Sequence, residues 1–219
     1  MTDIIPGKPR LLAFLDCMCS WCYGFAPAME AVRRHFGDRL DYMLFTGGLR
    51  PFTTEPMAEA MRRKLAGVYM KIEEVSGQPF TTARLMDPAF IYDTEPASRA
   101  IVAMRHFAPA EDYSFYLSIQ KAFYARGEDI THEDVLAAYA ELFGVARGDF
   151  LEAFRSEAIK QAVLGDFDVA RRFGIDGFPS LVLHRLESAN PQAMIMVRQG
   201  YAPAEQAIRE IEAGLAAEV

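Results

Sequence analysis

The stretch from Asp16 to Phe25 constrains the fold of this 219-residue chain more than any other. It reads Asp-Cys-Met-Cys-Ser-Trp-Cys-Tyr-Gly-Phe and holds all three cysteines and the only tryptophan of the protein. A short apolar run precedes this stretch and a helical pattern follows it, so Cys19-Ser20-Trp21-Cys22 lies at a strand-to-helix junction. A C-x-x-C pair in that position is typical of dithiol–disulfide chemistry.

The two cysteines of this pair are predicted to have different roles. The first turn of a helix offers unpaired N–H groups and a positive dipole end, which favour a thiolate at Cys19. Cys22 lies one turn deeper and can close back on the first sulfur. We therefore predict that Cys19 attacks and Cys22 resolves. Ser20 and Trp21 lie between them and tune the thiolate, and Trp21 is either an exposed substrate platform or buried packing.

Asp16 and Cys17 precede the pair, and each allows two interpretations. Asp16 ends the apolar run and is expected to cap the helix or the turn. Alternatively, its carboxylate accepts the proton of Cys22 during resolution of the mixed disulfide. Cys17 is expected to be a small buried residue, the usual fate of a free cysteine. A disulfide from Cys17 to Cys19 or Cys22, or a glutathione bound to Cys17, is less favoured. Cysteines so close along an extended chain are poorly placed for an unstrained bridge.

A zinc site is the main competing interpretation of the C-x-x-C pair. Tetrahedral zinc takes four ligands, usually as two separated pairs. The other candidates are Cys17 and four scattered histidines without the spacing of a second pair. The sequence therefore favours redox chemistry and no metal.

Composition and charge restrict the partners. The chain is 51% apolar and 24% charged, which is ordinary for a globular protein. Its 23 basic and 30 acidic residues give a net charge of −7, which argues against nucleic acid or an anionic membrane as the main partner. The apolar run near the N-terminus is too brief for a secretory or membrane-spanning segment, so we expect a cytoplasmic protein.

The order of the predicted elements indicates an α/β fold. Residues 10–16 and 40–45 read as buried strands around a helix over 22–36, and strand–helix–strand favours a parallel pair. From residue 53 the pattern is helical. The first helix of this region has an apolar stripe from Met57 to Val75 and a possible N-cap at Thr54 before it. Strands over 180–184 and 193–197 then form an antiparallel hairpin before a last helix over 203–217.

This order, with C-x-x-C after the first strand and Gly177-Phe178-Pro179 before a late strand, resembles the DsbA family. The motif from Asp16 to Tyr23 is most similar to the FrnE-type cytoplasmic branch of DsbA-like protein-disulfide isomerases. That branch lies near hydroxychromene-carboxylate isomerases and kappa-type glutathione transferases. Ser-Gly-Gln-Pro-Phe at 76–80 and Tyr-Asp-Thr-Glu-Pro at 92–96 also resemble landmarks of this branch.

The resemblance implies a thioredoxin fold that carries an inserted all-helical domain. Residues 1–53 and 165–219 would form the thioredoxin-like domain and residues 54–164 the insertion. Pro179 would be a cis-proline facing the active site. The Phe178 backbone would then offer hydrogen-bonding groups to a substrate strand or to glutathione, and its ring would form a wall of the sulfur site. No bound cofactor is implied, but glutathione is a candidate co-substrate.

We therefore predict a thiol–disulfide oxidoreductase that acts as reductase or isomerase on a disulfide- or thiol-containing protein or small molecule. Two other hypotheses stay open. One is a kappa-type glutathione-dependent isomerase or transferase, which Cys19 argues against because a serine commonly takes that place. The other is a thioredoxin-fold adaptor that delivers a regulator to a protease and whose cysteines are incidental.

Overall fold

The structure is a computed structural model that describes residues 7–185 and 194–217. The elements of the first half are β1 (Arg10–Leu15), α1 (Ser20–Phe36), a 3₁₀ turn η1 (Gly37–Arg39), β2 (Asp41–Thr46), α2 (Glu59–Ser76), α3 (Ala83–Met86) and α4 (Glu95–Phe107). Those of the second half are α5 (Asp112–Arg126), α6 (Glu133–Glu141), α7 (Arg147–Arg155), α8 (Glu157–Arg172), β3 (Ser180–His184), β4 (Met194–Gln199) and α9 (Ala204–Ala216).

The described strands form one sheet in the order β2-β1-β3-β4. β1 pairs with β2 in parallel, as expected for two strands joined by a helix, and pairs antiparallel with β3. The predicted hairpin of β3 and β4 is confirmed, with a register shift at Leu181 and Val182. β4 continues two residues beyond its predicted end, while residue 193 lies outside the described residues.

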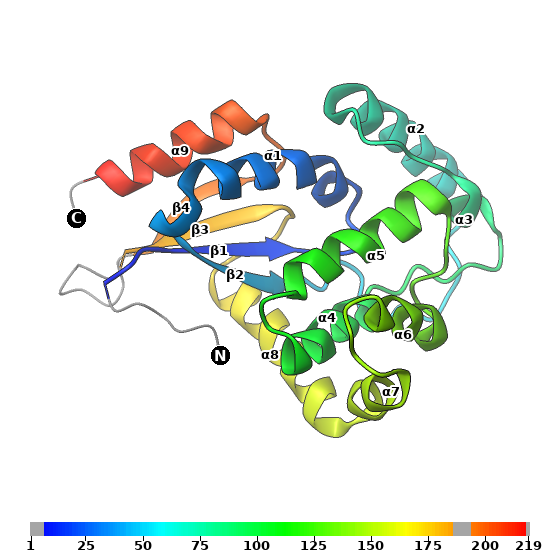
Figure 1. Cartoon of the computed structure of the whole chain (residues 1–219). Coiled ribbons are helices and arrows are strands. Elements are labelled where there is room, and N and C mark those ends of the chain that lie inside the picture. The colour runs from blue at the N-terminus through cyan, green and yellow to red at the C-terminus, as the bar shows by residue number, and fades with distance from the viewer. Residues whose placement is uncertain (1–6, 186–193, 218–219) are drawn as a thin grey trace.

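Helices cover both faces of the sheet, α1 and α9 on one side and α8 on the other (Figure 1). Successive residues of β1 point to opposite faces. Leu11 therefore belongs to the core under α1 and α9, while Leu12 and Phe14 pack against Ala170 of α8. This double coverage explains why the strand reads as a continuous apolar run rather than as an alternating one.

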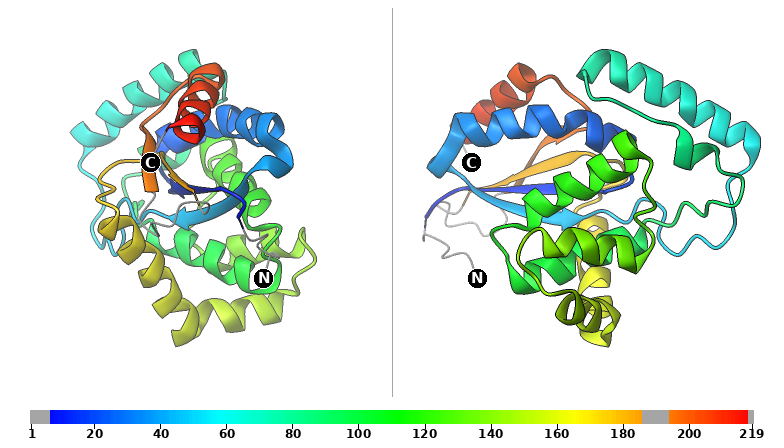
Figure 2. Two further views of the ribbon diagram at one scale, coloured as in Figure 1. Left: turned by 90° about the vertical axis from the view of Figure 1, so that its left-hand side faces the viewer. Right: turned by 45° about the vertical axis from the view of Figure 1, so that its right-hand side comes forward.

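The helices from α2 to α7 form a block beyond the carboxyl end of β1 (Figures 1 and 2). Within the block, α4 contacts α5, α6 and α7, and it also contacts α8. The predicted α/β fold with an inserted helical block is confirmed. The proposed division at residues 164 and 165 falls inside α8, which packs on α4 and α7 and also on β2.

A partly buried ionic cluster joins the helical block to the sheet. Arg105 of α4 contacts Asp166 of α8 at 3.1 Å and Asp112 of α5 at 3.2 Å, and it donates to the Leu44 carbonyl at 2.6 Å. Asp166 also accepts the backbone N–H of Thr46 at 3.0 Å. One guanidinium therefore connects three helices and β2.

The stripe from Met57 to Val75 predicts that its methionines pack in the core, which is confirmed for Met57 and wrong for Met61. Met61 is 42% exposed and Val75 is 48% exposed, whereas Tyr69 and Ile72 are buried. α2 packs mainly on α1 and α3 at the edge of the molecule (Figure 1), so only part of its surface is covered. The helix also begins at Glu59 after an Ala58 N-cap, so Thr54 does not cap it.

Within residues 7–185 and 194–217, no helix combines the length and the apolarity needed to cross a membrane.

Candidate active site

Cys19 lies at the N-cap of α1, four residues after the end of β1. Its backbone is extended, with φ −87° and ψ 113°, and its carbonyl accepts the N–H of Tyr23 at 3.1 Å. The Cys19 N–H bonds the Asp16 carbonyl at 3.1 Å, which closes a tight turn between strand and helix. The helix therefore begins at Ser20, two residues earlier than the sequence indicates. The predicted position of Cys19 at a helix N-terminus is confirmed.

The two sulfurs of the C-x-x-C pair have different surroundings. Cys19 is 6% exposed and Cys22 is 1% exposed, and both are free thiols. Burial raises the pKa of Cys22 well above 9, and its hydrogen bond with the Cys19 sulfur raises it further. Cys22 is therefore a neutral thiol at ordinary pH, and Cys19 is the less deeply buried residue of the two.

The loop before β3 brings Phe178 and Pro179 to the cysteine pair. The Phe178–Pro179 peptide bond is cis, as predicted. The Cys19 thiol donates to the Phe178 carbonyl at 3.4 Å, although the two residues are 159 positions apart. Pro179 is held in place through its carbonyl, which accepts the N–H of Gly200 at 2.7 Å. A backbone group of the predicted substrate-binding loop thus contacts the predicted nucleophile.

Asp16 is 1% exposed and bridges two loops. One carboxyl oxygen accepts the N–H of Met18 at 2.9 Å, and the other accepts the N–H of Leu49, after β2, at 2.8 Å. Burial raises the pKa of Asp16 to about 6, although these hydrogen bonds oppose the change. The predicted capping of the turn is confirmed. Proton acceptance from Cys22 stays a prediction.

Ser20 and Trp21 are both half-buried. The Trp21 ring lies 5.5 Å from the ring of Tyr201, which follows β4, and the Tyr201 hydroxyl donates to the Val75 carbonyl at 3.0 Å. Trp21 is therefore neither a fully exposed platform nor an entirely buried side chain. Its role in substrate binding stays a prediction.

Cys17 is 1% exposed, and its sulfur points to the Ala97 carbonyl of α4 at 4.0 Å. Burial raises the pKa of the Cys17 thiol well above 9. The prediction of a small buried residue is confirmed.

Three side chains of the helical block support the cysteine turn in ways that the sequence did not reveal. The Tyr92 hydroxyl donates to the Met18 carbonyl and lies 3.1 Å from the Tyr124 hydroxyl. The Gln120 amide reaches the Asp16 carbonyl at 3.5 Å. The motif at 92–96 offered a signal for Tyr92. In contrast, Tyr124 and Gln120 lie in a helix whose pattern indicates only burial.

Among the described residues, no group of three or more histidine, cysteine, aspartate or glutamate side chains is arranged to hold a metal ion.

Comparisons with solved structures agree with this architecture. A candidate protein disulfide isomerase from Nitrosomonas europaea is 32% identical and superposes with a TM-score of 0.86, covering 95% of this chain and 98% of that one. The cytosolic disulfide reductase DsbM from Pseudomonas aeruginosa is 24% identical with a TM-score of 0.72, covering 94% and 98%.

The ClpXP adapter protein SpxH from Halalkalibacterium halodurans is 24% identical over 182 residues. That match covers 80% of this chain and 58% of the adapter, so the chain spans little more than half the length of this relative. The DSBA-like thioredoxin domain matches residues 10–201, which include the cysteine pair, the cis-proline and the four strands among the described residues. The chain therefore belongs to the DSBA-like thioredoxin domain family.

Proposed function

We propose that the protein is a thiol–disulfide oxidoreductase that works through Cys19 and Cys22. The contact between the Cys19 sulfur and the Phe178 carbonyl carries this proposal. It places the less deeply buried cysteine of the pair at a helix N-terminus and beside the backbone of a cis-proline loop. An extended substrate can pair with such a backbone while its sulfur meets Cys19.

The proposed reaction proceeds in two exchanges. The Cys19 thiolate attacks one sulfur of the substrate disulfide, and a mixed disulfide forms while the other substrate sulfur leaves with the electron pair. Cys22 then loses its proton and attacks the Cys19 sulfur, which releases the second substrate sulfur. The substrate gains two electrons and the enzyme becomes the disulfide. Two molecules of an external thiol such as glutathione return it to the dithiol and leave as their own disulfide.

Resolution requires a proton acceptor, because burial holds the Cys22 thiol neutral. Asp16 is buried beside the turn and interacts electrostatically with Cys22. Above pH 6 its carboxylate is largely ionised and can accept the proton. Asp16 is therefore the proposed base for the second exchange.

Reduction or isomerisation in the cytoplasm is the proposed direction. Ser20 and Trp21 occupy the two positions between the cysteines. Strongly oxidising members of the family that the chain resembles carry a histidine there, so its absence favours reduction or isomerisation. The named relatives support this assignment. One is a candidate protein disulfide isomerase, and another is a cytosolic disulfide reductase that was also solved with GSH. The proposed substrates are protein or small-molecule disulfides, with glutathione as co-substrate.

The test compares wild type with Cys19→Ser and Cys22→Ser in the reduction of insulin disulfides by glutathione. Wild type should accelerate the reaction, and Cys19→Ser should return it to the uncatalysed rate. Cys22→Ser should accumulate a mixed disulfide that mass spectrometry detects. Equal activity of wild type and Cys19→Ser would refute the proposal.

An adaptor function is the second candidate, and the similarity to SpxH favours it. An adaptor would bind its partner through a surface and would not need the sulfurs. The double variant Cys19→Ser/Cys22→Ser should then deliver a bound protein to the ClpXP protease as well as wild type does. Loss of insulin reduction without loss of delivery would assign the cysteines to a separate activity.

A further inference from the structure

A groove of about 600 Å³ lies between the C-terminal end of α4, α7 and the N-terminal half of α8. α7 and α8 meet at Ser156, which ends the first helix and caps the second, so the groove lies at a corner of the chain. None of the described residues that line it belongs to the cysteine turn, the cis-proline loop or the loop after β2. The groove is therefore separate from the candidate active site.

Much of the groove surface is carbon. Phe107, the last residue of α4, lines it and is 39% exposed, and Ile159 of α8 lies beneath it with 7% exposed. Ala153, Ala158 and Ala162 complete this surface. Ala158 and Ala162 are exposed and lie one turn apart on α8, so another chain can approach this helix closely.

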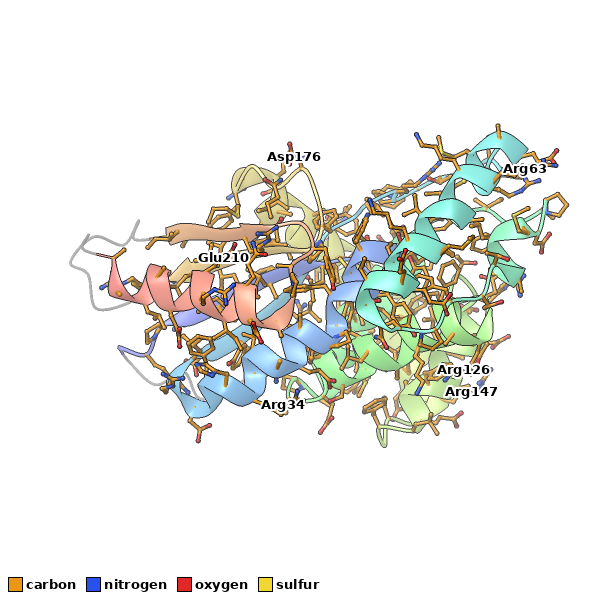
Figure 3. The ribbon with its side chains drawn as sticks, turned by 90° about the horizontal axis from the view of Figure 1, so that it is seen from above. Arg34, Arg63, Arg126, Arg147, Asp176 and Glu210 are labelled. Atoms are coloured by element: carbon orange, nitrogen blue, oxygen red, sulfur yellow. The ribbon has the colours of Figure 1, made fainter. Side chains whose placement is uncertain are left out.

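α7 separates its charged side chains between two faces. Arg147 and Arg155 each pair with a carboxylate of α6, at 2.6 Å and 2.5 Å. Figure 3 shows Arg147 near the outer edge of the helical block. Asp149 and Glu152 lie three residues apart on the other face and line the groove. The cations of α7 therefore point to α6, while its carboxylates point to the groove.

The negative charge of the groove is not compensated by the helices that form it. Every lysine and arginine of α4, α7 and α8 already pairs with a carboxylate elsewhere. Within the described residues, neither Asp149 nor Glu152 forms an ion pair. Asp149 lies in the first turn of α7, where a carboxylate favours the helix itself, but Glu152 lies beyond that turn.

The helical walls restrict the conformation of an occupant. The groove is formed by helices and the corner between them, so an extended peptide finds no strand edge to pair with. A helix satisfies its own backbone hydrogen bonds and presents apolar anchors about one turn apart. The volume of the groove has room for more than one such side chain.

We infer that this groove binds a basic amphipathic helix of another protein, with apolar side chains on the carbon surface and lysine or arginine side chains beside Asp149 and Glu152. Charge complementarity favours this occupant. A second copy of the chain carries the same net charge of −7, and an anionic membrane repels both carboxylates. The site adds a polypeptide partner that does not depend on the proposed thiol–disulfide exchange.

The test uses the full chain and two fluorescein-labelled peptides of about 18 residues, long enough to form a helix on binding. Both carry leucine at every third or fourth position. One has lysine and the other glutamate at the flanking positions. Fluorescence anisotropy should show that the lysine peptide binds at least about 10-fold more tightly, and added salt should weaken its binding.

A pair of charge variants locates the contact. Asp149→Asn/Glu152→Gln keeps the side-chain shapes and should weaken binding of the lysine peptide about 5-fold, as expected for two exposed ion pairs. Glu55→Gln/Glu74→Gln is the matched control, because it removes the same charge from exposed positions outside the groove. An equal loss in both double variants would show a general effect of net charge and would overturn the inference.

A second pair of variants tests the carbon surface. Ala158→Trp fills the groove from an exposed position and should weaken binding at least about 10-fold. Ala60→Trp adds the same ring to an exposed position of α2 and should leave binding unchanged. Both variants should keep the urea midpoint and the insulin reduction rate of wild type. Binding that survives in Ala158→Trp would overturn the inference.

The other occupants give distinct results. Concentration-dependent dimers in sedimentation, lost in Ala158→Trp, would assign the groove to a second copy and overturn the inference. Flotation with phosphatidylserine vesicles, lost in the same variant, would do so in favour of a membrane. Cys19→Ser should bind the lysine peptide as wild type does, so failure of the proposed function and failure of this inference are separate outcomes.

Discussion

Asp16 should make the stability of the protein depend on pH in a way that one substitution removes. Its carboxyl is buried, and burial raises its pKa from 3.8 to about 6. Between these values the folded protein binds a proton that the unfolded chain has released. The free energy of unfolding is therefore highest below pH 4 for this group and falls as the pH rises through 6.

The size of this effect follows from the two pKa values. The difference between 3.8 and about 6 corresponds to about 3 kcal/mol, of which roughly half is lost by pH 5. Asp16→Asn has nearly the same shape and no charge. It loses one accepting oxygen at the N–H groups of Met18 or Leu49, but that cost does not change with pH. Only the pH dependence therefore reports on the buried carboxylate.

The assay is urea unfolding of wild type and Asp16→Asn at pH 4, 5, 6, 7 and 8. The difference in unfolding free energy should move by about 2–3 kcal/mol in favour of the variant between pH 4 and pH 7. Asp38→Asn removes an exposed carboxylate and serves as the control. A difference between wild type and Asp16→Asn that stays constant over this range would refute the reasoning.

Three further substitutions test other contacts. Gly47→Ala should lower the free energy of unfolding in urea by about 1–3 kcal/mol, because the added Cβ would overlap the Phe178 ring. As the control, Gly67→Ala adds a Cβ in open space on α2 and should raise that free energy by up to about 1 kcal/mol. Equal effects of the two substitutions would contradict this reasoning. Tyr92→Phe should cost about 1–3 kcal/mol because it leaves the buried Met18 carbonyl without its donor, and an unchanged urea midpoint would argue against that bond. Arg105→Met should cost about 3 kcal/mol by leaving the Asp166 carboxylate without its cation. Adding Asp166→Asn removes that charge but keeps an oxygen for the Thr46 N–H, so it should recover part of the loss; no recovery would show that the ion pair is not the cause.

Local pattern was sufficient for the positions of most elements. The apolar run before Asp16 and the period of the residues after Cys22 predicted β1 and α1, because burial on two faces or on one stripe leaves a readable spacing. The same reasoning overestimated the burial of α2. Its stripe predicts an apolar face, but whether another element covers that face depends on packing, and Met61 and Val75 are left exposed.

The sequence by itself determined that two cysteines one helical turn apart follow a buried strand, since spacing and helix chemistry are local properties. The resemblance to the DsbA family also predicted the cis peptide bond at Pro179, which the residue pattern alone does not indicate. Only the tertiary structure decided that the Cys19 sulfur meets the Phe178 carbonyl, that Asp16 is buried between two loops, and that a groove forms between α4, α7 and α8. These features depend on contacts between segments far apart in the chain, and the physical quantities that follow from them, desolvation and enclosed volume, exist only after the segments have packed.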